Sequence, residues 1–211
     1  MIGVFDSGVG GLTVVKEIFR HLPQYQIVYF GDTARLPYGT KGADFVKRYS
    51  KKITEWLLRK GAKIIVVACN TSSAWAADYL KKEFPSIPIF EMIDPAVLAV
   101  LPVKDQGIGV IGTPGTIKSG AYDRKLKAVN SKIKIVSKPC PLFVPMIEEG
   151  IIDGQIAEDI TKLYCEAFKN KKISSLILAC THYPLLEKTI SKTMGKNIGI
   201  INPAASLAKS L

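Results

Sequence analysis

The sequence has 211 residues, of which 47% are hydrophobic and 22% are charged, a composition typical of a globular protein with a buried core. It contains no run of about 18 consecutive apolar residues, so a membrane span is not expected. A strand is predicted from the second residue onward, which leaves no room for a signal peptide. We therefore expect a cytoplasmic protein.

The cysteines and histidines disfavour metal and disulfide chemistry. The chain has four cysteines, none of them in a C-x-x-C pair, and only two histidines. A structural zinc site needs closely spaced ligand pairs, and a disulfide framework is typical of short secreted chains. We expect free thiols in a reducing compartment and no bound metal.

Basic residues outnumber acidic ones by 29 to 18, which gives a net charge of +11. Such a charge can attract an acidic small molecule or a nucleic acid. The lysines and arginines are spread through helical patterns without interleaved aromatic side chains, which favours a solvated basic surface. Neither a nucleic acid nor a membrane is expected as a partner.

In the first half, short apolar runs alternate with segments of helical spacing. Strands are predicted at residues 2–5, 26–30, 64–68 and 87–91, and helices at residues 12–21 and 41–60 and after Cys69. Gly61 is expected to end the long amphipathic helix, and Asn70 or Thr71 to cap the helix that follows the third strand.

The same alternation restarts near Asp94 and fills the second half. Strands are predicted at residues 107–111, 134–137, 174–179 and 198–201, and helices at residues 120–129, 156–169 and 185–194. Strands that alternate with helices predict an α/β protein with a doubly wound, mostly parallel sheet in each half. Ligands of such sheets bind at the carboxyl ends of the strands.

Two segments of the chain are nearly the same. Residues 64–69 and 176–180 are both apolar runs that end in Ala-Cys, followed by residues that cap helices, and residues 2–8 resemble residues 108–114. This pattern indicates a duplicated unit in which each copy delivers one thiol, Cys69 or Cys180, to a strand end. A helix N-terminus beside each thiol favours the thiolate. Two such groups facing each other suit the removal of a proton from one face of a carbon and its replacement on the other.

Other polar residues lie near these strand ends. Asp6 and His182 are the candidate assistants of the two cysteines, although a turn residue and a packed imidazole are the plainer interpretations. Asp32 is a candidate ligand for an ammonium group or a solvated loop acid, and Glu148 is a weaker candidate. The remaining cysteines, 140 and 165, are interpreted as structural.

The glycine-rich turns do not match nucleotide-binding patterns. Residues 8–13 lack the third glycine of the dinucleotide fingerprint, and residues 112–115 lack the G-K-[ST] ending of a phosphate loop. What they predict is a tight turn into a helix N-terminus, whose free N–H groups suit a carboxylate or a phosphate.

Several motifs together resemble the cofactor-independent aspartate/glutamate racemase superfamily, and its glutamate branch in particular. They are Asp6-Ser7-Gly8-Val9-Gly10-Gly11-Leu12, Gly31-Asp32, Pro37-Tyr38-Gly39, Ala68-Cys69-Asn70-Thr71, residues 109–113, residues 140–145 with 148–150, and Cys180-Thr181-His182-Tyr183-Pro184-Leu185-Leu186. His182 resembles the glutamate branch, because aspartate racemases tend to carry an acid there.

The resemblance implies two pseudo-symmetric α/β domains, residues 1–93 with a return at 203–211 and residues 94–202, with the active site in the cleft between them. It implies that the protein racemises glutamate without a cofactor and so supplies D-glutamate for bacterial peptidoglycan. It also implies a homodimer. Cys69, Cys180, Asp6 and His182 match the catalytic positions. The positions expected to hold the substrate are Ser7, Asp32, Pro37, Tyr38, Gly39, Asn70, Thr71, Thr113, Thr116, Glu148 and Thr181.

Family members normally extend a few dozen residues beyond the position of Leu211, so a C-terminal helix and strand are expected to be missing and the chain to be less stable for it. Two alternative functions stay open. One is a Cys–His acyl-transfer hydrolase that uses Cys180 with His182, and the other is an inactive basic binding protein.

Overall fold

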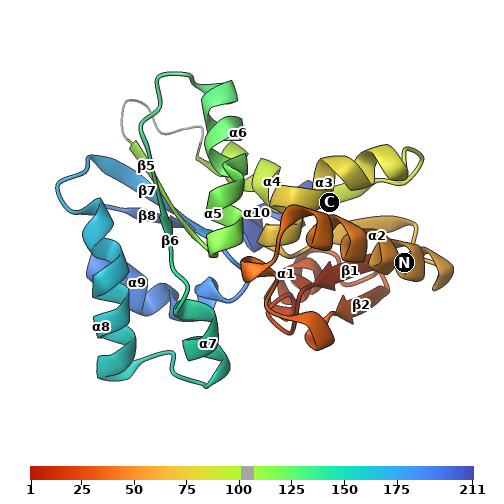
Figure 1. Ribbon diagram of the computed structural model, residues 1–211, viewed down its shortest axis with the longest axis horizontal. Helices are drawn as coiled ribbons and strands as arrows, with labels where there is room; N and C mark the ends of the chain where they lie inside the picture. Colours follow the sequence, from red (N-terminus) through yellow and green to blue (C-terminus); the bar gives the residue numbers. More distant parts are fainter. Residues whose placement is uncertain (101–106) are drawn as a thin grey trace.

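The computed structural model describes residues 1–100 and 107–211. It contains two four-stranded parallel sheets, each covered by helices, which lie side by side (Figure 1). The elements of the first half lie to the right in that view and those of the second half to the left. The expected α/β class with a doubly wound parallel sheet in each half is confirmed.

The first sheet has the strand order β2-β1-β3-β4, and all its strands are parallel. Its strands are β1 (Ile2–Asp6), β2 (Ile27–Gly31), β3 (Ile64–Val67) and β4 (Ile89–Glu91). The helices of this half are α1 (Leu12–His21), α2 (Ala43–Arg59), α3 (Asn70–Glu83) and α4 (Ile93–Ala99), with short 3-10 helices η1 (Thr33–Arg35) and η2 (Tyr38–Thr40).

The second sheet repeats this arrangement with the order β6-β5-β7-β8. Its strands are β5 (Gly107–Gly112), β6 (Ile135–Pro139), β7 (Ile173–Ala179) and β8 (Gly199–Ile201). The helices are α5 (Pro114–Ser119), α6 (Ala121–Val129), α7 (Phe143–Glu148), α8 (Gly154–Cys165), α9 (Glu187–Met194) and α10 (Pro203–Ser210), with η3 (Glu166–Phe168) and η4 (Tyr183–Leu186). Strand β7 therefore corresponds to β3, so Cys180 and Cys69 follow equivalent strands.

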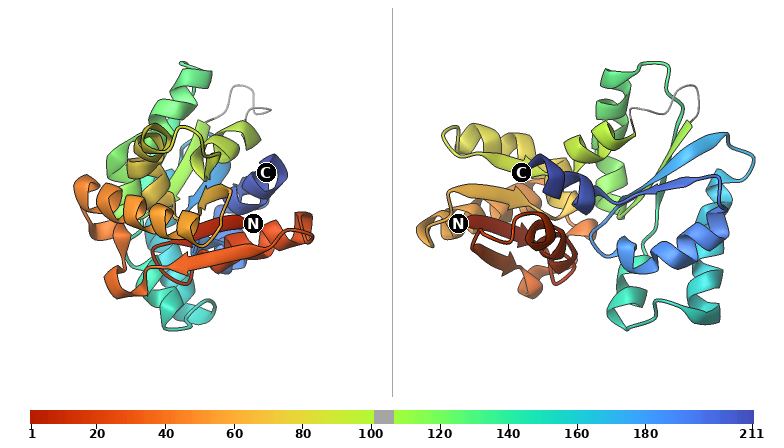
Figure 2. Two further views of the ribbon diagram at one scale, coloured as in Figure 1. Left: turned by 90° about the vertical axis from the view of Figure 1, so that its right-hand side faces the viewer. Right: turned by 180° about the vertical axis from the view of Figure 1, so that it is seen from behind.

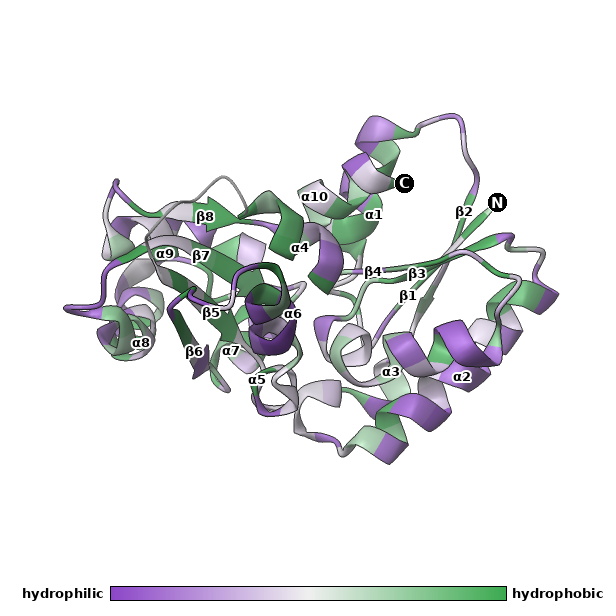
Figure 3. Cartoon of the chain, turned by 90° about the horizontal axis from the view of Figure 1, so that it is seen from above, coloured by the Kyte–Doolittle hydropathy of each residue, from purple (hydrophilic) through white to green (hydrophobic). Residues whose placement is uncertain are grey.

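Burial explains why the central strands are almost entirely apolar. The side chains of β1, β3 and β7 are covered on both faces by helices, as is usual in parallel sheets. The helices instead alternate apolar and charged residues, and Figure 3 shows hydrophilic stretches along α2 and hydrophobic strands behind it. Among residues 1–100 and 107–211, no helix is long and apolar enough to cross a membrane.

Four predicted helices differ from the observed ones at their ends, and the one predicted over 120–129 does so only by beginning at Ala121, as α6. The helix predicted over 156–169 is α8, which gives way at Glu166 to the 3-10 helix η3. The one predicted over 185–194 begins as the 3-10 helix η4, and the one over 41–60 is slightly shorter as α2. The short helices α4, α5 and α7 were not predicted, because six or seven residues show too little periodicity.

Helix α10 returns to the first half of the molecule. Ala204, Leu207 and Ala208 pack in one buried cluster with Val14 and Ile18 of α1 and with residues of β1. Figure 2 shows this last helix, in dark blue, beside the elements of the first half rather than at the far end of the second. This packing is compatible with the predicted domain limits of 1–93 with 203–211 and 94–202, which stay a prediction.

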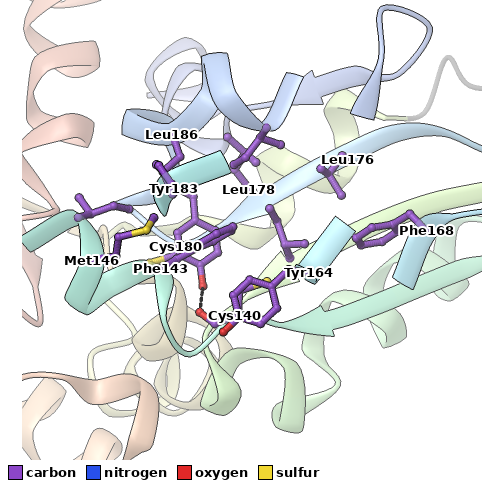
Figure 4. Close-up of a cluster of buried hydrophobic side chains, with 14 of the residues drawn as sticks. Cys140, Phe143, Met146, Tyr164, Phe168, Leu176, Leu178, Cys180, Tyr183 and Leu186 are labelled. Carbon is purple, nitrogen blue, oxygen red and sulfur yellow. Dashed lines mark hydrogen bonds between the residues drawn. The ribbon is translucent and has the colours of Figure 1, made fainter. Parts of the chain in front are cut away.

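A buried aromatic cluster supports the segment that follows β7. Phe143 packs edge-on against both Tyr164 and Tyr183, and the Tyr183 hydroxyl donates a hydrogen bond to the carbonyl oxygen of Cys140 at 3.0 Å (Figure 4). Tyr183 is completely buried. Because Tyr183 begins η4, this contact fixes the backbone just beyond Cys180.

Candidate active site

The two cysteines predicted to act together lie on one cavity between the halves. Cys69 follows β3 of the first sheet and Cys180 follows β7 of the second, and both thiols are largely buried, with 5% and 6% of each residue exposed. The other predicted site residues that line this cavity are Ser7, Pro37, Tyr38, Gly39, Asn70, Thr71, Thr113, Glu148, Thr181 and His182.

Cys69 is the N-cap residue of α3. Its Sγ accepts a hydrogen bond from the backbone N–H of Ser72 at 3.5 Å and donates one to the Ser7 hydroxyl at 3.6 Å. Burial raises the pKa of the Cys69 thiol, and the charge of Asp6 raises it further, while the Ser72 N–H lowers it. The helix end therefore stabilises a thiolate that burial otherwise disfavours.

Cys180 lies beside an imidazole. Its Sγ is 3.9 Å from Nδ1 of His182, and Nε2 of the same ring is 3.1 Å from a carboxylate oxygen of Glu148. Burial raises the pKa of the Cys180 thiol well above its usual range, and backbone N–H groups of His182 and Tyr183 oppose that rise. Cys180, His182 and Glu148 therefore lie in one row of contacts, and their roles in the site stay predictions.

Asp6 lies behind the cavity lining rather than on it. Its carboxylate accepts hydrogen bonds from the backbone N–H of Gly8 at 3.0 Å and from the Thr181 hydroxyl at 3.4 Å, and the residue is completely buried. Burial raises the pKa of Asp6, whereas the nearby His182 lowers it. Asp6 therefore connects the turn after β1 with the segment that carries Cys180.

Three threonine hydroxyls form a triangle across the two halves. Thr71 Oγ1 lies 2.9 Å from Thr113 Oγ1 and 3.1 Å from Thr116 Oγ1, and the last two are 3.0 Å apart. Thr113 also caps α5 by accepting a hydrogen bond from the Thr116 N–H. Thr116 is only 1% exposed and does not line the cavity, so it supports the other two hydroxyls from behind.

Asp32 is also outside the cavity lining. One carboxylate oxygen accepts a hydrogen bond from the Arg35 guanidinium and the other from the Tyr38 hydroxyl, both at 2.6 Å. Asp32 therefore anchors the loop that carries Tyr38 into the cavity. Its predicted role as an ammonium ligand stays a prediction, and both of its oxygens already have partners.

Sequence reasoning missed several neighbours of the site. Leu36 and Val144 add apolar surface to the cavity, and Gly8 adds backbone. Gly10 is pressed against the site, because a Cβ atom there would lie 2.5 Å from the His182 ring. Of these, Gly8 and Gly10 had a sequence signal, since both lie in the glycine-rich turn after the first strand.

Comparison with known proteins identifies the family of the chain. The Asp/Glu/Hydantoin racemase family matches residues 2–211. A glutamate racemase of Aquifex pyrophilus is 49% identical over 211 residues, covering 100% of this chain and 81% of that protein. One of Geobacter metallireducens is 45% identical over 209 residues, covering 99% of this chain and 77% of that protein.

The solved structures that resemble this chain are also racemases. The structure of glutamate racemase from Francisella tularensis in complex with D-glutamate has a TM-score of 0.94 at 42% identity, covering 99% of this chain and 78% of that one. An aspartate racemase from Picrophilus torridus, at 19% identity and a TM-score of 0.71, shares the fold. Because the family match spans nearly the whole chain and the relatives exceed 40% identity, this protein belongs to the Asp/Glu/Hydantoin racemase family.

Proposed function

We propose that this chain interconverts L-glutamate and D-glutamate by proton transfer between two thiols. The observation that carries the proposal is that Cys69 and Cys180, from equivalent strands of a duplicated unit, line one cavity. The similarity to glutamate racemases supports glutamate as the substrate. His182, which follows Cys180-Thr181, is a second argument for glutamate over aspartate, because aspartate racemases tend to carry an acid at that position.

In the proposed reaction, the thiolate of one cysteine removes the α-proton, and the electron pair of the broken C–H bond passes into the α-carboxylate. The thiol of the other cysteine then donates its proton to the opposite face of the carbon, and the two roles exchange in the reverse direction. Because burial raises both thiol pKa values, the thiolate needs help. The α3 N-terminus supplies it at Cys69, and His182 accepts the proton of Cys180.

The anionic substrate is bound by uncharged donors in this proposal. Ser7, Thr71, Thr113 and Thr181, which carry hydroxyl groups, and Asn70, which carries an amide, line the same cavity. Donors fixed in a buried site stabilise negative charge more strongly than water does, and they do so most where charge develops on the α-carboxylate. This stabilisation substitutes for the electron sink that a cofactor provides in other racemases.

The experiment is to incubate the purified chain with L-glutamate in deuterium oxide and to follow optical rotation together with deuterium at the α-carbon. We expect loss of optical activity with one solvent deuterium incorporated per inversion. Cys69→Ser and Cys180→Ser should each reduce turnover by at least about a thousandfold, because an alcohol is a far weaker acid than a thiol. Cys140→Ser, which alters a buried thiol outside that cavity lining, is the matched control and should keep its activity.

One contact favours a second function, a hydrolase. The 3.9 Å approach of Cys180 Sγ to His182 Nδ1 resembles a nucleophile with its base. The same experiment separates the two functions, because a hydrolase incorporates no deuterium at the α-carbon and does not require Cys69. Inversion of glutamate that survives in both cysteine variants would contradict the two-thiol mechanism, because one remaining thiol can exchange the α-proton on its own face but cannot deliver a proton to the other.

The biological setting is part of the proposal. We infer that the product D-glutamate serves bacterial peptidoglycan synthesis, and that the chain works as a cytoplasmic homodimer. Size-exclusion chromatography with light scattering measures the oligomeric state directly, and a single-copy mass at working concentration would contradict the dimer.

A further inference from the structure

Asn70 is held by a hydrogen bond from the other half of the molecule. Its Oδ1 accepts a hydrogen bond from the hydroxyl of Tyr122 at 2.6 Å, and both residues are nearly inaccessible, at 3% and 2% exposed. Asn70 begins α3 of the first half, whereas Tyr122 lies in the first turn of α6 of the second. The contact therefore spans the boundary between the halves.

The amide nitrogen of Asn70 makes no hydrogen bond within the part of the chain that the structure describes. Among residues 1–100 and 107–211, its Nδ2 is a buried donor without a hydrogen-bond partner. An unpaired buried N–H group is costly, so native proteins normally supply a partner or reserve the group for a ligand. Asn70 lines the cavity and adjoins Cys69, so a ligand oxygen bound near the reacting carbon is the natural acceptor.

The tyrosine decides which way the amide faces. Burial raises the pKa of Tyr122 well above its usual value, so the phenol stays neutral and keeps a proton to donate. An amide rotated by 180° would present its NH₂ group to that proton and leave the phenol without an acceptor. The hydrogen bond thus keeps Oδ1 on the Tyr122 side and leaves the buried Nδ2 of this cavity-lining residue as a donor for a ligand.

Helix α6 is fixed in place independently of this bond. One turn further along the same helix, Lys125 forms ion pairs with Glu91, at the end of β4, and with Asp94 of α4. Tyr122 also packs in a buried cluster with Ile93 and Val97 of α4. The phenol therefore meets Asn70 from a rigid position, which a positioning group needs.

We propose that Tyr122 is a positioning residue, which orients the Asn70 amide so that Nδ2 donates a hydrogen bond to the substrate α-carboxylate. The inference rests on the proposed glutamate racemisation and deepens it, because it makes recognition of the carboxylate depend on a contact between the two halves. A donor that binds the carboxylate equally in the ground state and the transition state acts on KM rather than on kcat.

The test compares Tyr122→Phe with Tyr164→Phe. Each variant removes one buried phenol hydroxyl of the second half, and the Tyr164 hydroxyl, which accepts a hydrogen bond from the Leu142 N–H, lies away from the cavity. We expect Tyr122→Phe to raise KM for glutamate about tenfold with kcat changed less than threefold, since roughly this factor corresponds to a hydrogen bond to a charged group. Tyr164→Phe should leave both constants unchanged.

A double-mutant cycle separates positioning from general support of the fold. If Tyr122 acts through Asn70, Tyr122→Phe has no further effect on KM in an Asn70→Ala background. An equal loss in both backgrounds, or an unchanged KM in Tyr122→Phe, overturns the inference.

A binding measurement distinguishes failure of the inference from failure of the proposed function. The side-chain amide signals of Asn70, identified in a nitrogen-15 spectrum by their absence from Asn70→Ala, should shift when D-glutamate is added to the wild-type protein, and shift less in Tyr122→Phe. Wild-type turnover without that shift overturns the inference alone. Absent turnover overturns the proposed function, and the Asn70 signals then decide the inference, which stands if D-glutamate shifts them and falls if it does not.

Discussion

Gly10 is a residue whose side-chain size matters to the candidate site. A Cβ atom at this position would lie 2.5 Å from Cε1 and Nδ1 of the His182 ring and 2.6 Å from the Thr181 hydroxyl, closer than such contacts allow. The imidazole must therefore move if Gly10 becomes alanine. Because Nδ1 is the atom that approaches Cys180, the thiol loses its proton acceptor.

We expect Gly10→Ala to lower kcat for glutamate by at least about tenfold, because a displacement of about 1 Å can cost a hundredfold in a positioned site. Gly42→Ala is the control, since no atom lies within 4 Å of the added Cβ and the backbone there is extended. Steady-state kinetics on both variants checks the prediction. Equal kcat values for the two would show that the His182 position does not limit turnover.

Cys165 gives a pH dependence that is separate from catalysis. Burial raises the pKa of this thiol to about 11 from a usual value of 9.0. Between these two values the folded state binds the proton that the unfolded state has lost. Cys165 therefore makes its full contribution to the free energy of unfolding below pH 9, and this contribution is lost as the pH rises toward 11.

Urea unfolding at pH 8, 9 and 10 measures this effect. We expect the free energy of unfolding to decline with pH in the wild-type protein and to decline less in Cys165→Ala, with the other buried cysteines accounting for the remainder. Parallel declines in the two proteins would mean that Cys165 does not titrate in this range.

The residues that sequence alone predicted are those with a local signal. Cys69 and Cys180 stand out because each ends an apolar run in a repeated segment. Tyr122 carries no such signal, because its partner Asn70 is 52 positions away and only the folded chain brings them together. The bonds from Arg35 and Tyr38 to Asp32 are equally hidden from the sequence, because loop geometry is not encoded in a repeating pattern.

Among the elements, strands and long helices were predictable and short helices were not. All eight strands were predicted to within two residues at either end, because buried parallel strands are short apolar runs bounded by turns. Helices α5 and α7 have only six residues each, and both contain proline within a turn-like sequence. Both helices nevertheless help to position residues of the candidate site, since α5 begins next to Thr113 and α7 ends at Glu148.

The N-cap of α10 can be tested by substitution of Asn202. The Asn202 side chain accepts a hydrogen bond from the backbone N–H of Ala204 at 3.0 Å, and the helix then packs on α1. Asn202→Ala should lower the free energy of unfolding by about 1 kcal/mol, the usual value of an N-cap. Asn202→Asp keeps an acceptor there and should be close to wild type in the same urea experiment. A loss as large in Asn202→Asp as in Asn202→Ala would contradict the capping role.

At the scale of the whole molecule, the two halves are connected by polar contacts as well as by chain crossings. The Thr13 hydroxyl donates a hydrogen bond to the Thr181 carbonyl oxygen at 2.9 Å, joining α1 to the segment after β7. On another side, Lys125 of α6 pairs with Glu91 and Asp94. The cavity between the cysteines is therefore framed by contacts that fix the halves relative to each other.

The ion pair between Lys125 and Glu91 is sensitive to pH because of the burial of Glu91. Its carboxylate is 2% exposed, and it accepts hydrogen bonds from the backbone N–H groups of Ile93 and Asp94 at 2.6 and 2.9 Å. Burial raises the pKa of Glu91, whereas Lys125 lowers it. Removing the ammonium group would leave a buried carboxylate without its cation, and its pKa would rise further.

We expect Lys125→Met to lower the free energy of unfolding by about 2 kcal/mol at pH 7, less than for a fully buried pair because Lys125 is partly exposed. The folded-state pKa of Glu91 in this variant lies above its unfolded value. Protonation therefore stabilises the variant as the pH falls, and its deficit relative to the wild-type protein should narrow between pH 7 and about pH 5. Adding Glu91→Gln removes the titrating group and should abolish that narrowing. A deficit that is constant over this range would instead assign the effect of Lys125 to Asp94 and to packing of its side chain.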